Sequence, residues 1–523
     1  MVPQGSSPSN PDLPQTVHVV RGRARAEAVA PVAAALQELL GHDVAAWRDR
    51  GFDVVKERTV RTVLQGMLGG VPVHIKVFRT DTLSDRARDA LRGPRGAREQ
   101  RNLLRARALD LPTVEPLACG MAGDGDQLRS FLITRSVAPA APFHFGMPGH
   151  VQQQVGSLLR RMHDAGVLPG DLHPGNLLVD AAEAPWLLDL SSVRHGGEAS
   201  LSQRAAALAL FCHQLDGGPL DPRARRLLDG YRTEGAELPA KLTRELMFAA
   251  RRWRASALPA FGRRCTRTCR HTEVPERRRG EPRWYWHLGA GVVAARGATD
   301  ELRSSCAQIA QQPPPPTKTG RRGGVWVLDT VVMKEREAGA AKKLWRAAYW
   351  LLFAGVATPP PIALRTFRSR GAVFSQRLAN DSLATELAAG RLAPAAIDAA
   401  AQSLGRNVGR LHAHGLRNRD LKFDNLVRNP HTGEVAMVDL DGVARQSATD
   451  TRGAGADLGR LLAAFRAAGA PGGNATVRTF LRSWLRAHRT LLQQPPLRRL
   501  LRTAEHRAGE WAAAHRHERT AAR

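Results

Sequence analysis

A short segment that occurs twice constrains the fold of this chain more than any other feature. The segment HDAGVLPGDLHPGNLLV begins at His163, and HAHGLRNRDLKFDNLVR begins at His412, 249 positions further on. The two align without a gap and share the pattern Asp-Leu-x-x-x-Asn-Leu. A repeat at so long a period indicates a duplicated domain, because solenoid repeats are much shorter. The length of 523 residues also suits two or three domains.

Each copy of the segment follows a predicted helix. Apolar residues recur at helical spacing in residues 151–162 and 397–411. Gly166 and Gly415 stand just after these stretches, where a left-handed residue commonly ends a helix. The repeated segment is therefore expected to be a helix end followed by a loop.

A short apolar run follows each loop and predicts a buried strand. The runs are residues 186–188, just before Asp189, and residues 436–438, just before Asp439. We expect each of these carboxylates to emerge at the end of its strand, beside the repeated loop.

A β-rich region lies upstream of each copy. Residues 53–79 predict three strands with a Gly-Gly turn, and residues 318–336 predict a corresponding hairpin with an Asp-Thr turn. Each region ends in a lysine with apolar neighbours, Lys76 in the first half and Lys334 in the second. A helix is expected after each lysine.

These elements predict an α+β fold with two tandem bilobal domains, each a small β-rich lobe plus a larger, mostly helical lobe. The domains are expected at residues 37–255 and 284–515. Residues 1–36 are expected to be a disordered lead-in, and residues 256–283 a basic connector rich in Arg.

Phosphoryl transfer from ATP needs a lysine and a divalent metal ion against the phosphate charge, and a carboxylate that orients the acceptor hydroxyl. Each half offers such groups in the same order. The candidates are catalytic Asp171 and Asp420, ATP-binding Lys76 and Lys334, and the Mg²⁺ ligands Asn176, Asp189, Asn425 and Asp439. In the alternative interpretation they are turn caps and solvated strand ends, which the repetition of the whole series disfavours.

This series, with the phrases VPVHIKVFR and GAREQRNLLRARALDLPTVEPLACG, resembles the protein-kinase-like superfamily. Within it, the chain resembles the bacterial lipopolysaccharide kinase family, which phosphorylates Kdo or heptose of the lipid A core. The resemblance implies two tandem protein-kinase-like domains, ATP and Mg²⁺ as cofactors, and an anionic glycolipid or sugar as acceptor.

Three further residues take their meaning from this resemblance. Glu99 stands where such kinases keep an acid that pairs with the strand lysine, and Leu344 is its counterpart in the second half unless Glu335 or Glu337 substitutes. Lys422, two residues after Asp420, is a candidate contact to the transferred phosphate. An exposed helix acid and an exposed loop lysine are the alternative interpretations.

Both halves also depart from the kinase pattern. The His that commonly precedes the catalytic Asp by two is Pro169 in one copy and Asn418 in the other, and neither half has a clear G-x-G-x-x-G loop. Three functions therefore stay open: a kinase for a sugar hydroxyl of lipopolysaccharide core, a protein Ser/Thr kinase suggested by RDLKFDN, and a tandem pseudokinase scaffold.

The charge and the apolar content limit the partners and the location. A net charge of +29 favours anionic partners, but no recognised motif indicates nucleic acid. The longest apolar stretch, residues 347–357, is about half of the ~20 residues that a membrane span needs. We expect a cytoplasmic protein that can lie peripherally at the inner face of the cytoplasmic membrane.

The five cysteines are too few for a disulfide framework. Cys265, Cys269, His271 and Cys306 can be drawn as a zinc site, but the C-x-x-x-C spacing and the lack of a second pair favour unrelated thiols in a basic segment.

Overall fold

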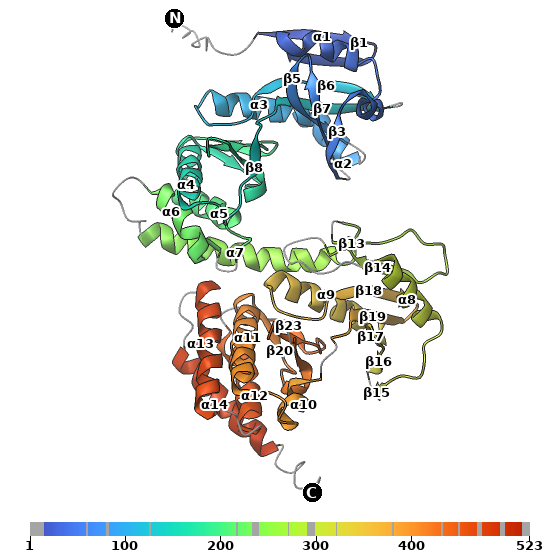
Figure 1. The fold of residues 1–523 in the computed structure, drawn as a ribbon, viewed down its shortest axis with the longest axis vertical. Helices are drawn as coiled ribbons and strands as arrows, with labels where there is room; N and C mark the ends of the chain where they lie inside the picture. The colour runs from blue at the N-terminus through green and yellow to red at the C-terminus, as the bar shows by residue number, and fades with distance from the viewer. Residues whose placement is uncertain are drawn as a thin grey trace, which may run out of the picture. The chain divides into compact units, whose positions relative to one another are not determined.

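The computed structural model divides the chain into two compact units. It describes residues 15–58, 61–79, 83–124, 127–215, 218–232, 240–269, 271–289, 299–320, 322–378, 381–429, 432–447, 450–467, 473–491 and 497–514. Unit 1 comprises residues 1–212 and 222–246, and unit 2 comprises residues 213–221 and 247–523. The helices, strands and their labels are shown in Figure 1.

Unit 1 begins with a seven-stranded antiparallel sheet in the order β1-β2-β6-β7-β5-β4-β3. Its strands are β1 (Thr16–Arg21), β2 (Ala24–Val29), β3 (Asp53–Arg58), β4 (Arg61–Leu68), β5 (Val71–Phe78), β6 (Pro116–Asp124) and β7 (Gln127–Arg135). Gly69 and Gly70, both at positive φ, form the β4–β5 turn and confirm the predicted Gly-Gly turn.

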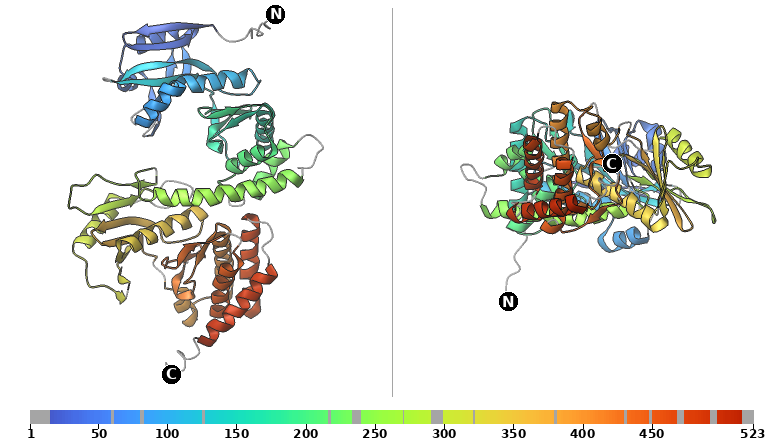
Figure 2. Two further views of the ribbon diagram at one scale, coloured as in Figure 1. Left: turned by 180° about the vertical axis from the view of Figure 1, so that it is seen from behind. Right: turned by 90° about the horizontal axis from the view of Figure 1, so that it is seen from below.

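The alternation of β5 places its lysine. Val73, Ile75 and Val77 are buried in the core that includes α1 (Ala30–Leu39), so Lys76 lies on the opposite face. That face is covered by α3 (Arg95–Arg107), which contacts β5, β6 and β7 and runs alongside the strands in Figure 2. The remaining elements before β6 are η1 (Val44–Arg50) and α2 (Leu83–Arg92).

The rest of unit 1 is mostly helical, with short strands that carry the repeated loop. Its elements are β8 (Ala140–Pro142), α4 (Gly149–Asp164), β9 (Val167–Pro169), η2 (Pro174–Asn176), β10 (Leu177–Asp180), β11 (Pro185–Leu187), β12 (Val193–His195), α5 (Leu201–Phe211), η4 (Pro222–Ala224) and α6 (Arg225–Tyr231). Gly166 has φ of 67° just after α4, as predicted for a helix end.

Unit 2 has a second seven-stranded antiparallel sheet, in the order β13-β14-β18-β19-β17-β16-β15. Its strands are β13 (Thr272–Glu273), β14 (Arg283–His287), β15 (Lys318–Gly320), β16 (Gly323–Val327), β17 (Val331–Glu337), β18 (Pro361–Phe367) and β19 (Arg370–Gln376). Val331 and Met333 are buried in the core on the side of α8 (Asp300–Gln311). Lys334 therefore lies on the face that α9 (Ala338–Ala354) covers.

The helical part of unit 2 surrounds the second copy of the loop. It contains α10 (Leu383–Ala388), α11 (Pro394–Ala413), β20 (Leu416–Asn418), η5 (Phe423–Asn425), β21 (Leu426–Arg428), β22 (Val435–Met437), β23 (Val443–Arg445), α12 (Thr451–Ala467), α13 (Gly473–Leu491) and α14 (Leu497–Ala514). Helix α11 packs against α13, and α12 packs against α14 (Figure 1). Gly415 ends α11 with φ of 68°, as predicted.

These elements confirm an α+β architecture, but the prediction for the N-terminus was wrong. Residues 16–36 of the expected lead-in form β1, β2 and part of α1, and residues 1–14 lie outside the described residues. The cause is the alternation of Ala24, Ala26 and Ala28, which point into the core while charged neighbours face outward.

Helix α7 (Ala240–Arg264) and strand β13 occupy parts of the residues expected to be a basic connector. Helix α7 begins in unit 1 and continues in unit 2, and the short η3 (Gly218–Leu220) also belongs to unit 2. None of the described helices has both the length and the apolar character that crossing a membrane requires.

The α11–α13 contact depends on glycine. A Cβ at Gly409 would lie 2.6 Å from the carbonyl oxygen of Trp484, whereas a Cβ at Gly509 in α14 would meet nothing within 4 Å.

We expect Gly409→Ala to destabilise unit 2 by about 1–3 kcal/mol, because the helices must separate to admit a methyl group. Gly509→Ala should instead stabilise it by up to ~1 kcal/mol through helix propensity. Urea unfolding of both variants measures these changes, and equal effects would contradict the close approach of the helices.

Candidate active sites

In unit 1 the predicted lysine and helix acid form an ion pair. Lys76 Nζ on β5 contacts Glu99 Oε1 on α3, and it also donates to the Leu188 carbonyl oxygen at 3.1 Å. Lys76 is therefore held between helix α3 and Leu188, the residue just before Asp189. This confirms that the two side chains meet; their role in binding ATP stays a prediction.

The Glu99 carboxylate is fully buried, and its second oxygen has no hydrogen-bond partner among the described residues. Burial raises the pKa of Glu99, because the charged form loses its hydration, and the charge of Lys76 opposes this effect. The ion pair with Lys76 therefore favours the position of α3 in which the buried carboxylate lies against the lysine.

Asp189 lies at the end of the strand that follows the loop, and a residue not predicted from the sequence holds it. Arg61 on β4 donates to Asp189 Oδ2 at 2.6 Å, and the backbone N–H of Ser191 donates to Oδ1 at 3.2 Å. Burial opposes ionisation of Asp189, but the charges of Lys76 and Arg61 outweigh it and hold the pKa well below its usual range.

The loop between β9 and β10 presents the other two candidates. Asp171 is exposed, and Asn176 is buried in η2 with its Nδ2 donating to the Asp171 carbonyl oxygen at 2.7 Å. The backbone carbonyl of Asn176 accepts from the Leu188 N–H at 3.0 Å. The loop is thus joined by its backbone to the strand end that carries Asp189.

In unit 2 the lysine pairs directly with the strand-end aspartate. Lys334 Nζ lies 3.1 Å from Asp439 Oδ1 and 3.4 Å from the Val438 carbonyl oxygen. Burial raises the pKa of Asp439, but the neighbouring Lys334 more than offsets this and lowers it overall. A second ion pair, Arg336 to Asp441 at 2.9 Å, lies two residues along on each segment.

The helix acid is missing from unit 2. Leu344, which the sequence alignment places opposite Glu99, is buried in α9. Glu335 pairs with Arg370 at 2.6 Å, and Glu337 precedes the first residue of α9. The structure shows no contact of either acid with Lys334 among the described residues.

The counterpart of Arg61 is also missing. Lys76 lies opposite Val63, and Lys334 lies opposite Val325, so Gly323 takes the place of Arg61 two residues earlier. Gly323 has φ of 128°, and a Cβ there would lie 2.1 Å from the Glu335 carbonyl oxygen. A side chain at this position would therefore clash with β17.

The second loop keeps the predicted geometry and brings its lysine close. Asn425 Nδ2 donates to the Asp420 carbonyl oxygen at 2.9 Å and to Oδ2 at 3.0 Å. Lys422 Nζ lies 3.7 Å from Asp420 Oδ1, and both side chains are about half exposed. The first loop has His173 at the place of Lys422.

Asn418 joins the loop at Asp420 to the strand end at Asp439, a role that the sequence did not indicate. It is buried, its Oδ1 accepts from the Asp420 N–H at 3.1 Å, and its Nδ2 donates to the Asp439 carbonyl oxygen at 3.4 Å. Its own N–H donates to Asp457 on α12 at 3.0 Å. Asp457 is fully buried and also pairs with Arg417 at 3.0 Å. One signal was visible: an acid on an otherwise apolar helix face.

The candidate metal ligands suit Mg²⁺ in their chemistry. In both loops the Asn side chain uses its amide nitrogen within the loop, which leaves the amide oxygen as the remaining ligand atom. Together with Asp189 or Asp439 this gives carboxylate and amide oxygens, the hard ligands that Mg²⁺ takes. No cluster of three His, Cys, Asp or Glu side chains that could hold a metal is found in the described ranges.

The class of the first site follows from comparison with known families. Residues 45–200 match the model of the lipopolysaccharide kinase (Kdo/WaaP) family. The match lies in unit 1 and includes Lys76, Glu99, Asp171, Asn176 and Asp189. It supports a phosphotransferase of this family for the matched segment. No curated protein matches the chain.

The repeated histidine of the first copy has a structural place. His163 is buried in α4, and its Nδ1 lies 2.8 Å from the Tyr231 hydroxyl. Burial, chiefly, lowers the pKa of His163 to about 4.

Because the unfolded chain binds a proton near pH 6.5 that folded His163 does not, the stability of unit 1 should fall as pH decreases from 6.5 to 4. His163→Gln should make this dependence shallower. Urea unfolding at a series of pH values tests it, and an unchanged slope in the variant would assign the pH dependence elsewhere.

Proposed function

We propose that the chain is an ATP- and Mg²⁺-dependent kinase that phosphorylates a sugar hydroxyl of lipopolysaccharide core, with unit 1 as the catalytic half. The carrying observation is the buried Lys76–Glu99 pair beside Asp189, within the segment that matches the lipopolysaccharide kinase family. The proposal includes two kinase-like domains, at residues 37–255 and 284–515, with the first sheet extended by β1 and β2.

The proposed roles follow from the charges and their positions. Lys76, oriented by Glu99, binds the phosphates of ATP. The exposed carboxylate of Asp171 accepts the proton of the acceptor hydroxyl. Asn176 and Asp189 would hold Mg²⁺, which neutralises charge on the transferred phosphate. Arg61 would then exchange its contact with Asp189 for a phosphate.

The acceptor is proposed to be an anionic glycolipid. The net charge of +29 favours binding to phosphorylated or carboxylated sugars and to an anionic leaflet. A protein held at the inner face of the cytoplasmic membrane by such contacts would meet the acceptor there.

Unit 2 supports a second candidate function. Lys422 beside Asp420 is the arrangement expected for transfer to protein Ser or Thr. Against turnover in this half stand Leu344 at the helix position and the direct pairing of Lys334 with Asp439. We propose that unit 2 is a non-catalytic or weakly catalytic copy.

Transfer of ³²P from [γ-³²P]ATP to delipidated core oligosaccharide tests the assignment. Asp171→Asn should reduce the rate by roughly 10²–10⁴-fold, the usual contribution of a positioned base. Asp420→Asn is the matched control and should retain the rate. Full activity in Asp171→Asn with loss in Asp420→Asn would move catalysis to unit 2. Mass gain of the protein itself with ATP would favour the Ser/Thr kinase.

The lysine–glutamate pair gives a separate test by nucleotide binding. Mg·ATP at about 100 times its Kd stabilises the protein that binds it by ~2.7 kcal/mol. Glu99→Gln should reduce this thermal shift, because Lys76 loses its orienting charge. Glu115→Gln, which removes a more exposed pair with Arg135, is the control and should keep it. An equal shift in both variants would contradict the role of Glu99.

A further inference from the structure

A cavity of about 850 Å³ in unit 2 lies beside the second loop and is not explained by the proposed phosphotransfer. Its walls come from the ends of β15, β16 and β17, the start of β19, one face of α9, the residue before Asp420 and the segment after Asp439. The volume falls within the ~300–1,000 Å³ that small-molecule sites occupy. Neither Lys334 nor Asp439 lines it.

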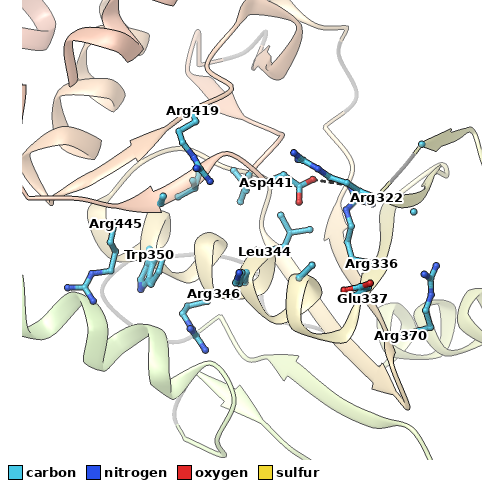
Figure 3. A pocket seen from close by; sticks show the side chains of 17 residues that line it. Arg322, Arg336, Glu337, Leu344, Arg346, Trp350, Arg370, Arg419, Asp441 and Arg445 are labelled. Atoms are coloured by element: carbon cyan, nitrogen blue, oxygen red, sulfur yellow. Dashed lines mark hydrogen bonds and ion pairs between the residues drawn. The ribbon is translucent and has the colours of Figure 1, made fainter. Parts of the chain in front are cut away.

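The lining is strongly basic. Two carboxylates, Glu337 and Asp441, face seven cationic side chains: Arg322, Arg336, Lys343, Arg346, Arg370, Arg419 and Arg445. Figure 3 shows Leu344 near the middle of the group, with Arg336 and Arg370 to one side and Arg445 and Arg346 to the other. The cations therefore come from different elements and surround one space.

Few of these charges are neutralised within the protein. Arg336 pairs with Asp441 at 2.9 Å, and Arg370 pairs with Glu335 at 2.6 Å. For Arg322, Lys343, Arg419 and Arg445, no ion pair is found within the described ranges. Like charges gathered around a cavity repel one another and create a positive potential that attracts an anion.

Leu344 sharpens this contrast between the units. In unit 1 the aligned helix position is Glu99, whose carboxylate forms an ion pair with Lys76 and so neutralises its charge. In unit 2 the same position is apolar and lines the cavity. The apolar Leu344 thus leaves the described lining of the cavity without a third carboxylate beside Glu337 and Asp441.

Arginine content points to the chemistry of the ligand. Guanidinium groups bind phosphate oxygens through two parallel hydrogen bonds, and six of the seven cations are arginines. We propose that this cavity binds a small, multiply phosphorylated anion at a site separate from the nucleotide residues of unit 2. The phosphates belong either to a soluble molecule or to a lipid head group.

Isothermal titration of the full chain with inorganic tripolyphosphate, without Mg²⁺, tests the site. Binding should be saturable and should weaken as salt increases. The double variant Arg419→Gln/Arg445→Gln should lower the affinity about tenfold or more. Arg406→Gln/Arg482→Gln, which changes two exposed arginines of α11 and α13 outside the cavity, should leave it unchanged. Equal losses in both would mean that net charge alone attracts the anion, and would overturn the proposal.

A second pair of variants changes charge at one half-buried position with little risk to folding. Ala340 lies in the first turn of α9 and lines the cavity. Ala340→Glu should weaken tripolyphosphate binding, whereas the uncharged Ala340→Gln should retain it. Lys334→Met should also retain it. Loss of binding in Lys334→Met but not in Arg419→Gln/Arg445→Gln would place the anion in the nucleotide site and refute a separate one.

The source of the phosphates is read from a parallel experiment. The chain is sedimented with phosphatidylcholine vesicles that carry a bisphosphorylated glycolipid. A lipid source predicts binding to these vesicles that Arg419→Gln/Arg445→Gln abolishes and tripolyphosphate competes away. A soluble source predicts tripolyphosphate binding without this variant-sensitive vesicle binding. Absence of both kinds of binding would refute the site.

Discussion

The carboxylate of Glu99 is fully buried, and Lys76 is the cation that pairs with it directly. A buried carboxylate without a cation would take up a proton, so the pair is maintained only while α3 and β5 stay together. The same lysine donates to the Leu188 carbonyl oxygen. The Lys76 side chain on β5 therefore connects the sheet to α3 and to the strand end that carries Asp189. The geometry of the first site depends on these two contacts.

Unit 2 satisfies the same strand end by other means. Lys334 forms an ion pair with Asp439, and Arg336 forms one with Asp441. Asn418 in the loop donates a hydrogen bond to the Asp439 carbonyl oxygen. Gly323 leaves no room for a counterpart of Arg61. Among its described residues, unit 2 thus lacks counterparts of Glu99 and Arg61 beside its lysine, and arginine side chains line the neighbouring cavity.

What could be predicted from the sequence was local or repeated. The Gly69-Gly70 turn, the left-handed Gly166 and Gly415, and the strands before Asp189 and Asp439 carry their own signals in residue type and period. The contact of Lys76 with Glu99 was predicted from the resemblance to the kinase family. Arg61 with Asp189, and Asn418 with Asp457, could not be predicted, because strand register and helix packing bring them together across long stretches of chain. Strand β2 was missed because small alanines fill most of its buried face, and β1 because only Val19 of its residues is buried.

The chain passes between the two units three times, after residues 212, 221 and 246. The short η3 is made before unit 1 is finished, yet it packs against α13, which the ribosome delivers nearly half the chain later. Helix α7 contributes to both units. Unit 2 therefore completes its native contacts only after its last helices are made, whereas all residues of unit 1 lie within positions 1–246. A cut after residue 246 would therefore leave residues 213–221, a segment of unit 2, covalently attached to unit 1.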